Sequence, residues 1–190
     1  ARIFEIAPCY IVSTSYTPYI KAVCDALAFP VENTFSTEIN IDEFQISSPE
    51  KATVKDFLSR IIEAPPFSLP NDLKSIDELN ESSRKTIRLM DQIFWEDLPK
   101  LAINQLLLRV NPVGGIEKAN AVEKIVMMQG CCLEDVMYVG DSITDVEAFR
   151  LVRKGGGLAV SFNGNDRAVK EAQIAVTSSN ALPTAFLAHM

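Results

Sequence analysis

The stretch VMYVGDSITD (residues 136–145) decides how this chain is interpreted. Four mostly apolar residues lead into Gly140, and two aspartates four positions apart follow at Asp141 and Asp145. An apolar run of this length indicates a buried strand. A strand that ends in carboxylates brings charge to the edge of its sheet. The stretch therefore predicts a strand, a polar loop and the start of a helix, with a functional site where they meet.

The rest of the chain alternates strands with helices. Thr17 is the expected N-cap of a helix, because Pro18 follows it at the first helical position. Apolar runs predict strands at residues 9–15, 136–140, 157–161 and 174–178, and a strand or hairpin within 32–44. Helices are predicted over residues 17–29, 116–130, 165–172 and 180–190, and after the loop at 141–145. Such alternation implies an α/β fold with a parallel, helix-covered sheet.

Residues 48–111 differ in composition from the flanking sequence. They are rich in charge, contain the segment EAPPFSLP, and suggest several helices, the first with Ser48 as N-cap before Pro49. We predict a small helical insert at 48–111, between core parts at 1–47 and 112–190. The acidic side chains of the insert are expected to form a solvated face.

Bulk composition excludes several classes of function. The net charge is −7 and the isoelectric point is about 4.8, which argues against nucleic acid or an anionic membrane as the main partner. No apolar run is long enough for a transmembrane helix, and no signal peptide is recognisable, so a cytoplasmic protein without membrane insertion is expected. The single histidine, His189, excludes zinc–histidine clusters and Ser-His-Asp triads. The four cysteines are expected to be reduced thiols.

Polar side chains lie at the ends of three of the predicted strands. Ser13 to Ser15 end the first, Asp141 follows the strand at 136–140, and Asn163 follows the strand at 157–161. The carboxyl ends of parallel strands meet at one edge, so these groups are expected to share a rim. A hydroxyl-rich turn before a helix suits a phosphate, and a carboxylate on a rigid strand end suits Mg²⁺.

Three local features leave alternatives open. Asp145 is either a helix N-cap alone or a cap that also orients a lysine of the site. Lys118 stands in the first turn of a helix, where its charge opposes the dipole, so a bound anion would explain it better than solvent does. The NGN at residues 163–165 is either a type I′ hairpin turn or, as we favour, a loop with Asn165 or Asp166 as helix cap.

Together these motifs resemble the haloacid dehalogenase superfamily, whose core is Rossmann-like with three layers. The resemblance rests on Ser13 after a strand, Lys118 at a helix start, and GDSITD about twenty residues later. It implies that Ser13 binds the substrate phosphate, and Thr14 and Asn163 at the same rim are expected to take part in substrate binding. It also implies that Lys118 contacts phosphate and nucleophile, Asp141 binds Mg²⁺, and Asp145 supports the catalytic lysine. An insert between the serine and lysine motifs is where one of the family's caps lies.

Two branches of the superfamily are the most similar. Residues 117–149 resemble phosphoserine phosphatase-like members. The segments IVSTSYTPYI, GGIEKA and LAVSFNGN are similar to archaeal proteins described as subunit R of the energy-converting hydrogenase A. The resemblance covers roughly residues 8–45 and 112–190.

The sequence departs from this family in one respect. The family's nucleophile is the first aspartate of a D-x-D motif after the first core strand, upstream of the serine, and no D-x-D occurs in this chain. Either the chain is a fragment, which its abrupt start without Met favours, or it is a degenerate member. In both cases the first core strand is missing, and a gap or an altered pairing is expected in the sheet.

Three functions follow from these alternatives. The first is a Mg²⁺-dependent phosphatase acting on a small phosphorylated metabolite, with the 190-residue chain itself inactive because it lacks the nucleophile. The second is a non-catalytic subunit of an archaeal hydrogenase complex. The third, weaker one is a receiver-like phospho-acceptor with Asp141 as acceptor. Partners are expected to be the phosphorylated substrate and either hydrogenase subunits or a second copy of the chain.

Overall fold

The computed structural model describes residues 7–40, 45–70 and 73–189. The chain divides into two compact units, one of residues 1–39 with 111–190 (unit 1) and one of residues 40–110 (unit 2). The domain boundaries at 47/48 and 111/112 stay a prediction, because compactness alone does not make a unit an independent folding domain.

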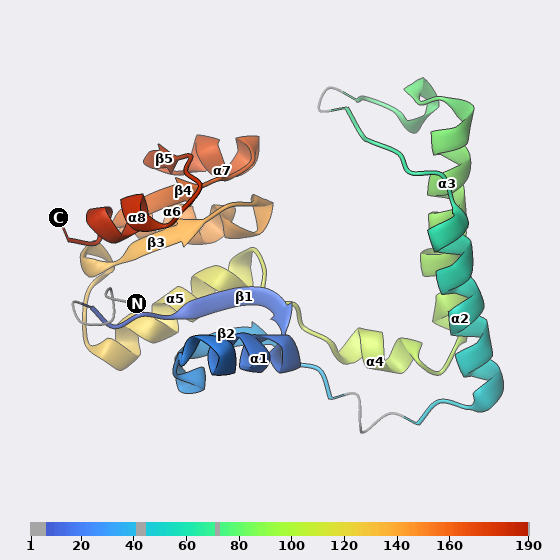
Figure 1. Cartoon of the computed structure of the whole chain (residues 1–190), viewed down its shortest axis with the longest axis horizontal. Helices are drawn as coiled ribbons and strands as arrows, with labels where there is room; N and C mark the ends of the chain where they lie inside the picture. Colours follow the sequence, from blue (N-terminus) through green and yellow to red (C-terminus); the bar gives the residue numbers. More distant parts are fainter. Residues whose placement is uncertain (1–6, 41–44, 71–72, 190) are drawn as a thin grey trace. The chain divides into compact units, whose positions relative to one another are not determined.

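Strands and helices alternate in unit 1, and helices dominate unit 2 (Figure 1). The strands are β1 (Ile11–Tyr16), β2 (Thr34–Thr37), β3 (Met137–Gly140), β4 (Leu158–Phe162) and β5 (Ile174–Val176). The helices of unit 1 are α1 (Thr17–Leu27), α5 (Ile116–Gln129), α6 (Val146–Lys154), α7 (Asp166–Glu171) and α8 (Leu182–Leu187). Those of unit 2 are α2 (Ser48–Glu63), α3 (Glu81–Asp91), the π-helical η4 (Gln92–Asp97) and α4 (Asn104–Arg109). Short 3₁₀ turns are η2 (Val31–Asn33), η3 (Ile76–Glu78), η5 (Leu98–Lys100), η6 (Leu133–Asp135) and η7 (Ile143–Asp145).

The strands form two parallel sheets rather than one. β1 pairs with β2, and β3, β4 and β5 form a second sheet in that order. Within the described residues no ladder joins β1 to β3. The predicted α/β fold with parallel strands is thus confirmed. The break between the two sheets has the form expected if the first core strand is missing.

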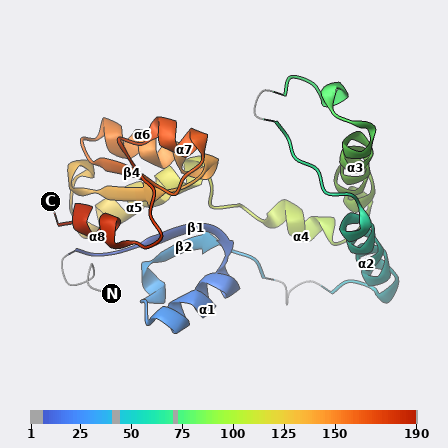
Figure 2. The ribbon, with the colours of Figure 1, turned by 45° about the horizontal axis from the view of Figure 1, so that its top comes forward.

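The core of unit 1 lies between the three-stranded sheet and its helices. Figure 2 shows α6 and α7 on the same side of β4. Phe149 and Val152 of α6, three positions apart, are both fully buried, as is Ala159 of β4. The ring of Phe149 meets that of Tyr138 edge-on, with centroids 5.5 Å apart and planes at 85°. This packing fixes the face of β3 from which the site is built.

Helix starts show where sequence prediction was right and where it was wrong. Tyr16, not Thr17, is the N-cap of α1, and the Thr17 hydroxyl instead bonds the Ser36 hydroxyl at 3.0 Å. Ser47, not Ser48, caps α2 by accepting from the Glu50 N–H at 3.3 Å. Both errors are one position, because Pro is tolerated at either of the first two helical residues.

The loop after β4 resolves the open alternative at NGN. Asn165 caps α7, accepting from the N–H groups of Arg167 at 3.0 Å and Ala168 at 3.1 Å. The helix-cap interpretation is therefore confirmed, and the type I′ hairpin is excluded. The helix predicted over residues 116–130 is also confirmed, since α5 ends at Gly130 with a φ of 64°.

Unit 2 has a small core of its own. Phe57 of α2, Ile93 of η4 and Leu106 of α4 are buried. The carboxylate of Glu50 accepts from the Ile103 N–H at 2.8 Å and so ties α2 to the segment before α4. Part of the strand or hairpin predicted within 32–44 forms as β2, and residues 41–44 lie outside the described residues. No helix in the described part of the chain has the length and apolar character to cross a membrane.

Candidate functional site

A buried ion pair joins helix α5 to the turn after β3. Lys118 Nζ donates to Asp145 Oδ1 at 2.7 Å, and the two residues are 7% and 2% exposed. Lys118 lies in the first turn of α5, where its charge opposes the helix dipole. The carboxylate of Asp145 is the anion that compensates this unfavourable position of the Lys118 charge. Of the two parts of the combined alternative for Asp145, the structure has the contact with the lysine, whereas the side chain makes no capping bond to α6 and closes the 3₁₀ turn η7 instead.

The second oxygen of Asp145 organises the turn itself. Asp145 Oδ2 accepts from the Asp141 N–H at 3.1 Å, the Ser142 N–H at 3.0 Å and the Ser142 hydroxyl at 3.1 Å. Tyr138 adds a hydroxyl donor to Oδ1 at 2.8 Å. Both carboxylate oxygens are thus committed to protein donors. Asp145 is built to position its neighbours and has little capacity left to ligate a metal.

Electrostatics favour the charged form of Asp145. Burial by itself raises the pKa of this carboxyl, but the hydrogen bond and charge of Lys118, the Tyr138 hydroxyl and the Asp141 N–H outweigh it, so the pKa lies below its usual value. The pKa of Tyr138 is raised, first by burial and then by the negative charge of Asp145. Tyr138 therefore stays protonated and donates at any physiological pH.

Gly140 makes this arrangement sterically feasible. A Cβ at position 140 would lie 2.5 Å from Asp145 Cγ, closer than real Cβ atoms approach other atoms. The glycine before Asp141 thus lets the carboxylate of Asp145 lie directly against the strand backbone. Sequence reasoning treated Gly140 only as the end of a strand and missed Tyr138. The signals were the glycine itself and a polar hydroxyl two residues before it.

Asp141 is the free carboxylate of the site. Its side chain is exposed and has no hydrogen bond or ion pair with the described residues, while its backbone carbonyl accepts from the Asn165 N–H at 2.9 Å. A hard, unpaired carboxylate fits a magnesium ion, which takes one or two protein carboxylates and leaves other positions to water and phosphate. Among the residues described, no three or more His, Cys, Asp or Glu side chains gather into a metal-binding group. The residues present therefore fit magnesium through one ligand.

Ser13 and Thr14 lie within β1, where a bulge begins after Ser13 and ends before Tyr16, and not in a loop after the strand. β1 continues to Tyr16, and its register with β2 shifts between Ser13 and Tyr16. The Ser13 hydroxyl accepts from the Ser15 N–H at 3.1 Å, and the Thr14 hydroxyl donates to the Val113 carbonyl at 3.0 Å. The bulge leaves backbone groups at this position outside the regular ladder.

A glycine joins this bulge to the turn that holds Asp145. A Cβ on Gly114 would lie 3.6 Å from both Thr14 Oγ1 and Thr144 Cγ2. Gly115 then donates its N–H to the Thr144 carbonyl at 2.9 Å and begins the helix that carries Lys118. Segments from three parts of the sequence thus meet in unit 1: the β1 bulge, the start of α5, and the turn after β3.

Asn163 is placed differently from the other predicted residues. It has a φ of 50°, and its side-chain amide makes two bonds with the backbone of Ser178, each of 2.9 Å. These bonds occupy both the Nδ2 and the Oδ1 of the Asn163 amide. The role of Asn163 in substrate binding stays a prediction.

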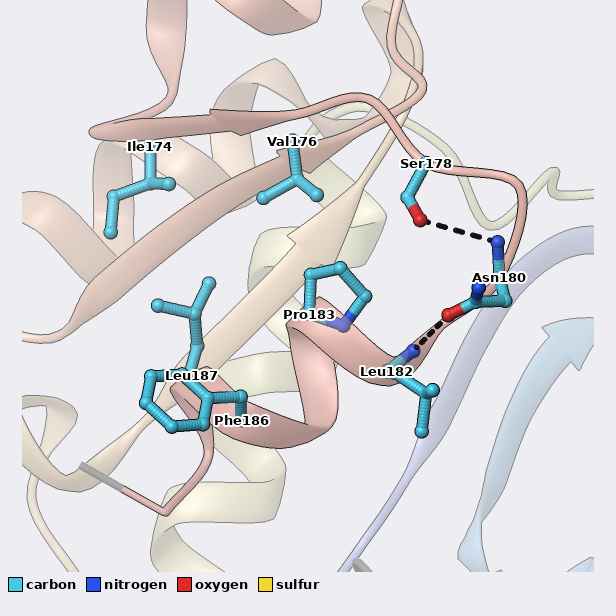
Figure 3. Close-up of a pocket in the computed structure, with 8 residues that line it drawn as sticks. All are labelled: Ile174, Val176, Ser178, Asn180, Leu182, Pro183, Phe186 and Leu187. Carbon is cyan, nitrogen blue, oxygen red and sulfur yellow. Dashed lines mark hydrogen bonds between the residues drawn. The ribbon is translucent and has the colours of Figure 1, made fainter.

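An apolar groove of about 490 Å³ lies next to Ser178, between β5 and α8 (Figure 3). Ile174 and Val176 of β5 face Pro183, Phe186 and Leu187 of α8 across it (Figure 3). The groove carries no charged lining residue, so the candidate chemistry lies at the strand ends and not here.

The fold and the site together define an α/β protein with a Rossmann-like core and a lysine–carboxylate pair at its strand ends. The family model of the haloacid dehalogenase-like hydrolases matches residues 23–183, which is most of the chain. The chain belongs to this family. The matched range includes Lys118, Asp141 and Asp145 and begins after the β1 bulge.

A solved structure is similar over nearly the whole chain. Gene product AF1437 from Archaeoglobus fulgidus shares 25% sequence identity with it, with a TM-score of 0.69. The alignment covers 95% of this chain and 50% of that one, so this chain spans about half the length of its structural neighbour. The comparison with curated proteins gave no significant match.

Proposed function

We propose that this chain supplies the phosphate- and metal-binding part of a Mg²⁺-dependent phosphatase that acts on a small phosphorylated metabolite. The observation that carries the proposal is the buried Lys118–Asp145 pair with the unpaired carboxylate of Asp141 four residues before Asp145. Family membership supports hydrolase chemistry, and haloacid dehalogenase-like hydrolases are typically phosphatases.

Lys118 is the residue proposed to bind the phosphoryl group. An ammonium has three N–H donors, and among the described residues one of them is committed to Asp145. Two donors remain for an anion at the strand ends. Asp145 fixes the ammonium in place, so its charge is preorganised before substrate arrives. In this proposal the Ser13 hydroxyl and the backbone of the β1 bulge contact the remaining phosphoryl oxygens.

Asp141 is the residue proposed to hold Mg²⁺. A bound magnesium ion would neutralise phosphate charge and strengthen its electrophilic character. The Asp141 backbone is held on both sides, by Asp145 Oδ2 at its N–H and by the Asn165 N–H at its carbonyl. The exposed carboxylate is therefore presented from a fixed backbone.

The nucleophile is proposed to lie outside this sequence. The family resemblance assigns it to an aspartate of a D-x-D motif, and the chain contains no such motif. That the chain spans half the length of its structural neighbour supports its being part of a longer protein. We expect the 190-residue chain to bind Mg²⁺ and phosphate without hydrolysing p-nitrophenyl phosphate. Hydrolysis that Asp141→Ala abolishes would contradict this assignment of the nucleophile.

Magnesium binding tests the proposal directly. Asp141→Asn is expected to weaken Mg²⁺ affinity at least about tenfold, since a neutral amide oxygen replaces the charged ligand. Titration calorimetry with MgCl₂ measures this. Asp25→Asn is the matched control, because Asp25 is an exposed aspartate on α1 with no side-chain partner in the described residues. Equal affinity in the two variants would reject Asp141 as the ligand.

A non-catalytic role is the second candidate. It is favoured by the lack of a D-x-D motif and by the similarity of IVSTSYTPYI, GGIEKA and LAVSFNGN to archaeal hydrogenase subunit R proteins. Its proposed form is an accessory subunit of an archaeal hydrogenase complex that keeps a phosphate or metal pocket. The longer protein of which this chain is proposed to be a part is here called the parent protein. Its co-purification with such a complex, together with no phosphatase activity in a broad Mg²⁺ screen, would favour the non-catalytic role. Turnover of a phosphate ester by the parent protein would exclude it.

A further inference from the structure

Thr37 is a buried polar residue that neither the motifs nor the proposed function use. It is the last residue of β2 and is 1% exposed. Its hydroxyl donates to the Thr14 carbonyl at 2.8 Å and accepts from the Val113 N–H at 3.0 Å. One side chain thus satisfies two backbone groups from segments about 100 positions apart, at the point where the phosphate-binding elements meet.

The β1 bulge explains why a hydroxyl is needed at position 37. Thr37 pairs with Tyr16, and the register shift leaves Thr14 without a regular partner on β2. The bond between the Thr37 hydroxyl and the Thr14 carbonyl is partly buried, and the hydroxyl supplies the donor that the ladder lacks at this position. The same oxygen then accepts from Val113, whose own carbonyl accepts from the Thr14 hydroxyl at 3.0 Å. The bulge is therefore closed by side chains and not by a ladder.

The hydrogen bonds continue from Thr37 to the Lys118–Asp145 pair. Val113 is followed by Gly114, which approaches Thr14, and by Gly115, whose N–H donates to the Thr144 carbonyl at 2.9 Å. Lys118 is three residues further along α5, and Asp145 directly follows Thr144. A displacement of Val113 would therefore move the helix start that carries Lys118 relative to the β1 bulge.

We propose that Thr37 is a positioning residue, which sets the distance between the hydroxyl-bearing bulge of β1 and the ammonium of Lys118 so that both can contact one phosphate. This inference rests on the proposed phosphate site and adds to it the residue that couples its two halves. Thr37 itself is buried and does not contact the ligand. It acts through Thr14 and Val113.

The test compares the orthophosphate affinity of the 190-residue wild-type chain with that of three variants, in the presence of Mg²⁺. Thr37→Val keeps the shape and removes the hydroxyl, and is expected to weaken binding about fivefold or more, the usual scale of a coupling between sites. Thr37→Ser keeps the hydroxyl and is expected to bind within about twofold of the wild type. Thr34→Val is the matched control, because the Thr34 hydroxyl on the same strand bonds the nearby Val31 carbonyl at 2.7 Å and, among the described residues, no group of the proposed site.

Two outcomes overturn the inference. One is a Thr37→Val chain that folds and binds orthophosphate as tightly as the Thr34→Val control. The other is a Thr37→Ser chain that folds with wild-type thermal stability and binds as weakly as Thr37→Val. Lys118→Met separates this failure from that of the proposed function. If removing the lysine leaves phosphate affinity unchanged, the site itself is wrong; if it abolishes binding while Thr37→Val does not weaken it, only the positioning role is wrong.

A measurement on the wild-type chain covers the case in which Thr37→Val does not fold. If the hydrogen bonds of Thr37 raise the affinity for phosphate, then bound phosphate must stabilise those hydrogen bonds by the same free energy. Orthophosphate is therefore expected to slow hydrogen exchange of the Val113 N–H about fivefold or more, with no change at the Asn33 N–H, which bonds the Pro30 carbonyl away from the site. Unchanged exchange at Val113 with phosphate bound would overturn the inference.

Discussion

At the scale of single residues, the site depends on one close approach. Only glycine fits at position 140, because a Cβ there would lie 2.5 Å from Cγ of Asp145. Both carboxylate oxygens of Asp145 are occupied in turn. Oδ1 accepts from Lys118 and the Tyr138 hydroxyl, and Oδ2 accepts from two backbone N–H groups and the Ser142 hydroxyl. The spacing of glycine and the second aspartate in GDSITD is thus a packing requirement as well as a chemical one.

Gly140→Ala is expected to destabilise the chain by about 1–3 kcal/mol, the usual cost of overpacking a closed site, because the new methyl group displaces Asp145. Chemical denaturation followed by circular dichroism measures this change in the free energy of unfolding. Gly114→Ala is the control, since a Cβ there would have ordinary contacts of 3.6 Å and no positive φ. Equal stability of the two variants would show that the turn can shift away from Gly140 without cost.

At the scale of elements, one carboxylate holds three of them together. Asp145 of η7 bonds Tyr138 of β3, Lys118 of α5 and the N–H groups that begin its own turn. The folded state lowers the pKa of this carboxyl, mainly because the Lys118 and Tyr138 bonds outweigh its burial. Its contribution to stability is therefore fully present above the pKa of the unfolded chain, about 3.9, and is lost as the pH falls through the lower pKa of the folded state.

Asp145→Asn is expected to cost about 3 kcal/mol or more at neutral pH, because it leaves the buried ammonium of Lys118 without its counter-charge. The difference in unfolding free energy between wild type and variant should shrink as the pH falls below about 4. Urea denaturation at a series of pH values measures it. Glu147→Gln, which alters an exposed pair with Arg150, should follow the wild-type curve. A difference that stays constant down to pH 3 would contradict the role of the Asp145 charge.

Elements were predicted well where local chemistry decides them. The closure of α5 at Gly130 and the cap at Asn165 follow from conformations and hydrogen bonds within a few residues. The strand predicted at residues 9–15 ends at Tyr16, one residue later, and the hydroxyl-rich turn expected at Ser13 to Ser15 is part of this strand. Its hydroxyls suggested a turn, whereas the pairing with β2 and the bonds of Thr37 keep this segment extended as a bulge.

At the scale of the whole molecule, the chain leaves and re-enters unit 1 at neighbouring points. Thr37 and Val113, on either side of the 40–110 segment, are joined by a 3.0 Å hydrogen bond. A short loop could therefore close unit 1, since loop closure depends only weakly on length. The core around Phe149 and Val152 is made entirely of unit 1 residues.

Replacing residues 40–110 by a short Gly/Ser linker is expected to leave unit 1 folded, with the Lys118–Asp145 pair intact. Thermal unfolding followed by circular dichroism and titration with MgCl₂ test this prediction. The shortened chain is expected to unfold cooperatively and to keep its Mg²⁺ affinity. Loss of substrate discrimination in the parent protein, with phosphate binding retained, would support a cap role for the insert. An unfolded shortened chain would show that unit 1 depends on unit 2, and would contradict the predicted core and insert.

The sequence by itself determined the α/β class, and it predicted a helical insert and named Lys118, Asp141 and Asp145 as candidates, because hydrophobic period and short motifs are local properties. Tertiary structure decided how those residues are used. It committed Asp145 to Lys118 and left the Asp141 side chain without a partner in the described part of the chain. It also engaged Asn163 with Ser178 and placed Thr37 between β1 and the start of α5. These outcomes depend on contacts between residues as much as 99 positions apart, such as Thr14 with Val113, and no local pattern encodes them.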